Sequence, residues 1–144
     1  MKNIFSGFLV LVISFIFFIS SLAKDQNIDK PGAIKHWGAI DVTLKSFNFQ
    51  GKHFTGVLVL RNTRDKEEII SSMLDLQVTN EEGDKGKTDW DQTEARCDGT
   101  IPPKGVFKCT FGYDFSEPPN QVTIRVGLDK GAYFIVKKKP ADKE

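Results

Sequence analysis

The chain has 144 residues and carries 20 lysines and arginines against 19 aspartates and glutamates, a formal net charge of +1 at pH 7. This length fits one domain with a hydrophobic core of its own. The near balance of charge gives the chain no overall attraction for polyanions or acidic membranes, so nucleic acid is excluded as a favoured partner.

Residues 1–23 show the pattern of a cleavable signal peptide. Lys2 precedes an apolar stretch over residues 4–19, and Ser21 and Ala23 put small side chains at the two positions that signal peptidase reads. An uncleaved anchor is the alternative, because a bilayer crossing needs about 20 apolar residues. We expect cleavage after Ala23, since no stop-transfer pattern follows. The mature protein is then secreted or periplasmic and free of the membrane.

The mature chain is expected to form one domain over residues 37–137, between a flexible lead at 24–36 and a charged tail at 138–144. Within the domain, apolar and polar residues alternate as they do in half-buried strands. Stretches rich in Asn, Asp, Gly and Pro separate the alternating segments. The sequence predicts strands over residues 40–44, 54–60, 69–70, 74–78, 107–113, 122–128 and 133–136, and a long loop at 85–98 that leads into a short edge strand.

This pattern predicts an all-β fold. Short strands with a turn signal every eight to twelve residues are typical of an antiparallel sandwich. We therefore expect an immunoglobulin-like sandwich of seven or eight strands, with a small β-barrel as the alternative. The lysines at 137–139 are interpreted as a solvated end of the last strand, and phosphate or membrane-surface binding is the alternative.

The chain has two cysteines, Cys97 and Cys109. An even count in an exported chain favours a disulfide. Cys109 alternates with Phe107 and Phe111, which places it on the core side of its strand. A redox or metal site is the alternative, but the two cysteines lack the C-x-x-C spacing.

Four segments carry a resemblance to a known family. They contain a strand that ends in Asn before a charged loop, a glycine turn, a proline-glycine turn, and a strand with Phe that exits through proline. The segments are VLRNTRDKEEI, LDLQVTNEEGD, TIPPKGVFKCTFGYDFSEPP and VTIRVGLDKGAYFIV. In these features the chain resembles the bacterial immunoglobulin-like (telokin-like) domain family of unknown function, found in secreted proteins and lipoproteins. The resemblance implies an extracytoplasmic module and no catalytic residue, and the cysteine pair departs from the family pattern.

The sequence shows no catalytic motif. Neither His36 nor His53 stands in a recognisable motif with a serine, and no G-x-S-x-G or glycine-rich phosphate loop occurs. His53 is interpreted as a residue at the rim of a strand rather than a catalyst. We expect no enzyme activity and no cofactor.

One acidic cluster offers a candidate metal site. Carboxylates close together on a loop could supply oxygen ligands for calcium. Their spacing does not match the twelve-residue calcium loop, so a solvated polar loop is the alternative. The calcium candidates are Asp84, Asp89, Asp91, Glu94 and Asp98.

A second candidate is an interaction surface for a protein partner. Trp90 either plugs one end of the sandwich or anchors a partner, beside a loop that the disulfide closes. The surface comprises Trp90, Gly99, Thr100, Ile101, Pro102, Pro103 and Lys104. The expected function is a noncatalytic binding module. The alternative is an inhibitor of a secreted protease or other enzyme, acting through the loop that Cys97 and Cys109 close.

Overall fold

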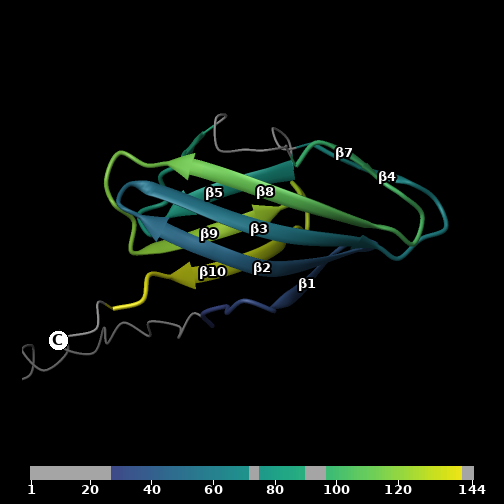
Figure 1. Cartoon of the computed structure of the whole chain (residues 1–144), viewed down its shortest axis with the longest axis horizontal. Coiled ribbons are helices and arrows are strands. Elements are labelled where there is room, and N and C mark those ends of the chain that lie inside the picture. The colour runs from purple at the N-terminus through teal and green to yellow at the C-terminus, as the bar shows by residue number, and fades with distance from the viewer. Residues whose placement is uncertain (1–26, 72–74, 90–96, 141–144) are drawn as a thin grey trace, which may run out of the picture.

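The computed structural model describes residues 27–71, 75–89 and 97–140 (Figure 1). The predicted signal peptide, residues 1–23, lies outside them. None of the described segments forms a helix of the length and apolarity that a bilayer crossing requires. The strands in these residues are β1 (Ile34–Trp37), β2 (Ile40–Gln50), β3 (His53–Asn62), β4 (Glu68–Ile70), β5 (Leu76–Asn80), β6 (Lys87–Thr88), β7 (Gly99–Ile101), β8 (Val106–Asp114), β9 (Gln121–Val126) and β10 (Ala132–Lys137).

The strands form two facing layers, so the predicted β-sandwich is confirmed (Figure 1). One layer is a five-stranded antiparallel sheet in the order β1-β2-β3-β8-β6. The other contains the three-stranded sheet β10-β9-β5 and the two-stranded ribbon β4-β7. Each described sheet ends in edge strands and does not close on itself, which excludes the barrel alternative. The described strands outnumber the seven or eight expected, because β1 and β6 are short and show no apolar alternation in the sequence.

The core lies between the inner faces of the two layers. It is aromatic along the five-stranded sheet, where the ring of Phe54 lies 4.9 Å from that of Phe49 and 6.3 Å from that of Phe111. Tyr113 continues this row at 6.0 Å from Phe111. Aliphatic side chains of the opposite sheet complete the core, namely Leu76, Val78, Val122, Ile124, Val126 and Val136.

A bulge in β2 explains why its second half was not predicted as a strand. The pairing of β2 with β3 shifts between Leu44 and Ser46, so one extra residue stands in β2. Such a bulge reverses which residues face inward. It turns Phe47 and Phe49 toward the core, where they pack on Phe54.

Gly56 provides the space for an aromatic contact between neighbouring strands. It pairs with Phe111, and a Cβ at this position would overlap the Phe111 ring. Glycine within a strand often marks such a close approach. The strand predicted at 54–60 therefore needs glycine at position 56, because a side chain there would displace the Phe111 ring.

The N-terminal lead differs from the expectation of a flexible segment at 24–36. The main-chain N–H of Asp29 donates to the carbonyl of Ile135, and the N–H of Ile135 donates to the Asp29 carboxylate at 2.9 Å. Lys35 forms a salt bridge of 3.0 Å with the same carboxylate. Asp29 therefore covers the free edge of β10, and β1 begins inside the expected lead. Edge strands need such cover because their unpaired main-chain groups would otherwise pair with other chains.

Asn62 is the buried polar side chain of the described core. Its amide nitrogen donates to the carbonyls of Lys66, Ile101 and Pro102 at 2.6, 3.3 and 3.2 Å, and its side-chain oxygen accepts the N–H of Arg64 at 2.9 Å. One side chain thus satisfies the main chain of two loops. Asn62 is the asparagine that ends β3 in the segment VLRNTRDKEEI, and it fixes the loops around the β4-β7 ribbon.

Candidate functional site

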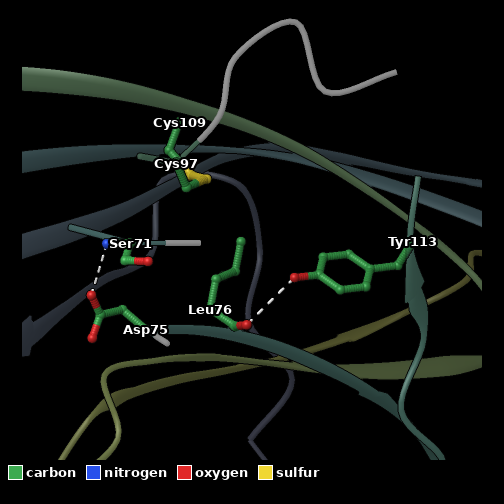
Figure 2. Close-up of a disulfide and its surroundings, with 6 residues drawn as sticks. All are labelled: Ser71, Asp75, Leu76, Cys97, Cys109 and Tyr113. Atoms are coloured by element: carbon green, nitrogen blue, oxygen red, sulfur yellow. Dashed lines mark hydrogen bonds between the residues drawn. A yellow bond between two sulfur atoms is a disulfide. The ribbon is translucent and has the colours of Figure 1, made fainter. Parts of the chain in front are cut away.

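The predicted disulfide between Cys97 and Cys109 is confirmed, and it joins the two layers (Figure 2). Cys109 is buried on β8 of the five-stranded sheet, and Cys97 is buried just before β7 of the ribbon. Their Cα atoms lie 4.7 Å apart, within the range that a disulfide can bridge. Figure 2 also shows the Tyr113 hydroxyl of β8 donating to the carbonyl of Leu76 on β5 at 3.4 Å, a second link between the layers.

The predicted interaction surface divides into exposed and buried residues. Ile101, the last residue of β7, packs into the core and is fully buried. It therefore cannot contact a partner. Thr100 is exposed and pairs with Ile69 of β4, whose side chain is 73% exposed. Ile69 was missed by the sequence analysis. It stands next to the buried Ile70, and only the pairing of β4 with β7 shows which of the two faces solvent.

The other members of that surface form a turn beyond β7. Pro102, Pro103 and Lys104 are exposed, and the N–H of Gly105 donates to the Pro102 carbonyl at 2.9 Å. Lys104 adopts a φ of 54°, and its ammonium group donates to the carbonyl of Thr63 at 2.6 Å. This turn is therefore fastened to the loop after β3. Trp90 lies outside the described residues.

The calcium candidates do not gather in the described part of the chain. Asp91 and Glu94 lie outside it. Asp84 belongs to the turn after β5, where its N–H donates to the side chain of Asn80 at 2.8 Å. Among the described residues, the one group of potential metal ligands contains Asp89 but neither Asp84 nor Asp98.

That group consists of His53, Asp89 and Asp114, and we call it the histidine cluster. His53 begins β3 and pairs directly with Asp114, the last residue of β8. Nδ1 of His53 lies 2.7 Å from Oδ1 of Asp114 and 3.7 Å from Oδ2 of Asp89. One ligand atom from each residue lies within 4.8 Å of the others. The strand pairing thus brings together residues that are 61 positions apart.

The main chain fixes all three residues of the cluster on one face. The N–H of Asp89 donates to the carbonyl of Gly112 at 2.9 Å, which continues the pairing of β6 with β8. Alternation along β3 and β8 directs His53 and Asp114 to the outer face of the sheet, opposite the buried Phe54 and Tyr113.

The histidine cluster is sheltered but reachable. The side chains of His53 and Asp89 are each 19% exposed, and that of Asp114 is 55% exposed. Nε2 of His53 is buried without a hydrogen-bond partner. The sequence named His53 as a rim residue and Asp89 as a calcium candidate, but it gave no signal that joined them to Asp114.

The charged tail lies beside an aromatic groove at the same end of the sandwich. Within the tail, the main-chain N–H of Lys138 donates to the Asn120 carbonyl at 2.8 Å. The groove has a volume of about 380 Å³ and is lined by Phe47, Asn48, Phe49, Lys138 and Lys139. The bulge in β2 creates its aromatic wall.

Comparison with known proteins shows a likeness of fold. No protein-family model matches the chain, and no curated protein matches it in sequence. The yjhA protein of Bacillus subtilis superposes with a TM-score of 0.58 at 8% identity, over 78% of this chain and 100% of its own. A predicted lipoprotein of the same species gives 0.59 at 11% identity, over 76% of this chain and 39% of its own.

A third structure comes from another genus. The secreted protein MPT63 of Mycobacterium tuberculosis gives a TM-score of 0.52 at 12% identity, over 77% of this chain and 96% of its own. These identities support statements about fold and not about shared chemistry. The chain has the β-sandwich fold that these bacterial proteins share.

Proposed function

We propose that this protein is an exported, noncatalytic binding module of the telokin-like immunoglobulin family, which acts in the periplasm or outside the cell. The observation that carries the proposal is the disulfide, which joins the two layers through the core. Disulfides persist in oxidising compartments outside the cytosol. The predicted signal peptide supports the same location, and two proteins of similar fold are described as secreted or as a lipoprotein.

The cysteines support a noncatalytic role. Nucleophilic catalysis by a serine or cysteine needs a base within hydrogen-bond reach of the nucleophile. Both cysteines are joined to each other, so neither supplies a thiolate.

The β4-β7 ribbon is the proposed surface for a protein partner. It presents Ile69 and Thr100 side by side, next to the exposed prolines 102 and 103. The disulfide and Asn62 hold the ribbon in place. A surface that is already rigid loses little conformational entropy on binding, which favours its use as a contact site.

The structure favours a binding module over an inhibitor. An inhibitory loop must offer extended main chain to the cleft of its target enzyme. Here the carbonyls of Ile101 and Pro102 already accept hydrogen bonds from Asn62, and the Pro102 carbonyl also accepts the N–H of Gly105. The main chain at this turn is therefore committed to the protein's own fold.

The test is a binding assay with Ile69→Asp and the matched control Ile34→Asp. Both isoleucines are exposed, at 73% and 58%, and both lie in short strands, but in different sheets. We immobilise the exported protein and measure saturable binding of extracytoplasmic proteins from the producing organism. Ile69→Asp is expected to weaken binding at least tenfold, because a buried carboxylate at a contact costs more than 1.4 kcal/mol. Equal binding by both variants and the wild type would rule out the ribbon as the contact surface.

A further inference from the structure

The histidine cluster has the donor set of a transition-metal site. It combines one imidazole nitrogen with two carboxylates, from His53, Asp89 and Asp114. Imidazole suits zinc and its neighbours in the first transition row, whereas calcium requires six to eight oxygen ligands. Three protein ligands and one water complete a four-coordinate zinc ion.

The geometry of the cluster fits such an ion. Zinc binds nitrogen and oxygen at about 2.0 to 2.2 Å, so two donors on a tetrahedral ion stand about 3.4 Å apart. Nδ1 of His53 lies 2.7 Å from one carboxylate oxygen and 3.7 Å from the other, distances that bracket this value. All three ligand atoms lie within 4.8 Å of one another, so side-chain rotations that bring the two carboxylates closer would complete the site.

The charges of the cluster also favour a divalent cation. Oxygens of Asp89 and Asp114 approach within 4.8 Å of each other on a partly sheltered face. Two carboxylates at this distance repel each other, and reduced contact with water strengthens the repulsion. A divalent ion between them converts the repulsion into attraction.

We propose that His53, Asp89 and Asp114 bind one zinc ion on the outer face of the five-stranded sheet. Nδ1 of His53 must carry a lone pair to bind the ion, so a neutral ring holds its proton on Nε2, and a protonated ring releases one proton. A histidine that binds zinc usually donates its second N–H to a partner, and loss of such a partner weakens a site about 10- to 100-fold. Nε2 of His53 has no such partner, so zinc binds reversibly and more weakly than at a structural site.

The first experiment titrates the metal-free exported protein with zinc chloride in a calorimeter. The wild type is expected to bind one zinc ion. Asp89→Asn and Asp114→Asn keep the side-chain shape and remove one anionic ligand each, and each is expected to weaken binding at least tenfold. The matched control is Asp41→Asn, because Asp41 faces His36 at 2.8 Å without being part of the three-residue cluster.

Three results would overturn the proposal. The first is the absence of zinc binding by the wild type. The second is a loss of affinity in Asp41→Asn that equals the loss in the two cluster variants. The third is calcium chloride displacing zinc at equal concentration, since the imidazole then contributes no selectivity.

A second measurement uses the wild type alone and so does not depend on how the variants fold. The chain has two histidines, so nitrogen-15 NMR of the imidazole rings separates the cluster from its control. Zinc is expected to shift the Nδ1 resonance of His53 and to leave both nitrogens of His36 unchanged. A shift of His36 alone, or of neither ring, would contradict the proposed site.

Discussion

The β4-β7 ribbon and the β2-β3 turn lie at opposite ends of the sandwich (Figure 1). These two ends use their polar groups in opposite ways. The ribbon end contains Asn62, the disulfide and the β4-β7 pair, and its buried polar side chain bonds to the main chain. The hairpin end contains the β2-β3 turn and the histidine cluster, where a histidine and two aspartates pair with one another near the surface.

Because of this difference, the two ends are suited to different roles. A buried amide whose partners are all main-chain atoms rigidifies the loops around it and is unavailable to a ligand. In contrast, the side chains of the histidine cluster are partly exposed, so they can give up their contacts with one another and bind an ion. The ribbon end is therefore suited to presenting a fixed surface, and the hairpin end is suited to binding a small charged ligand.

The largest effect is expected from breaking the polar network of the ribbon end with Asn62→Leu. This change keeps the branching of the side chain, although leucine is larger, and it leaves the Arg64 N–H and the buried Ile101 carbonyl without their partner. Each orphaned group costs about 1 to 3 kcal/mol, so we expect a loss of about 4 kcal/mol in the free energy of unfolding. Urea unfolding measures it. Asn48→Leu, on the exposed side of β2, is the control and should change stability by less than about 0.5 kcal/mol.

The next effect is expected from removing the disulfide with the double variant Cys97→Ala and Cys109→Ala. The bond closes a loop with a sequence separation of 12. Opening a loop of this size costs about 3 kcal/mol in the chain-entropy model. Urea unfolding of the variant and of the wild type with reductant should agree. A variant as stable as the oxidised wild type would contradict the role given to the disulfide.

The smallest effect is expected at the hairpin end, at Glu81. Burial would raise the pKa of this carboxyl, but hydrogen bonds from the main-chain N–H groups of Glu81, Asn120 and Gln121 outweigh it and hold the pKa below 4.5. A lowered pKa in the folded state gives stability above the unfolded value, and this stability is lost as pH falls through the folded value.

Glu81→Gln should therefore be slightly less stable than the wild type at pH 7, and the difference should shrink as the pH falls below 4.5 and through the lowered pKa of Glu81 in the folded state. Urea unfolding at several pH values measures the difference. Glu82→Gln removes the same charge from the same turn and isolates the effect of the bonds to Asn120 and Gln121. A difference between Glu81→Gln and the wild type that does not change with pH would show that these bonds do not act through the ionised carboxylate.

The main strands could be predicted because the alternation of apolar and polar residues can be seen within each segment alone. The apolar residues 122, 124 and 126 of β9 and the residues 107, 109, 111 and 113 of β8 alternate without interruption, and both segments are strands. The same alternation placed Cys109 in the core, and with Cys97 it sufficed to predict the disulfide.

The second half of β2 could not be predicted, and neither could the histidine cluster. The bulge near Lys45 breaks the period of two, so Phe47 and Phe49 look out of phase in the sequence. The histidine cluster depends on the pairing of His53 with Asp114, and register between distant strands leaves no mark in either segment.

The sequence by itself determined the strand content, the sandwich and the cysteine pair, because each follows from periodicity or from residue counts. Only the tertiary structure decided which end holds the buried amide of Asn62 and which end holds the histidine cluster. It also decided that Ile69 is exposed and Ile101 buried, although both are apolar residues of short strands. The physical reason is that burial and contact depend on what packs across from a residue, and strands distant in sequence supply those neighbours.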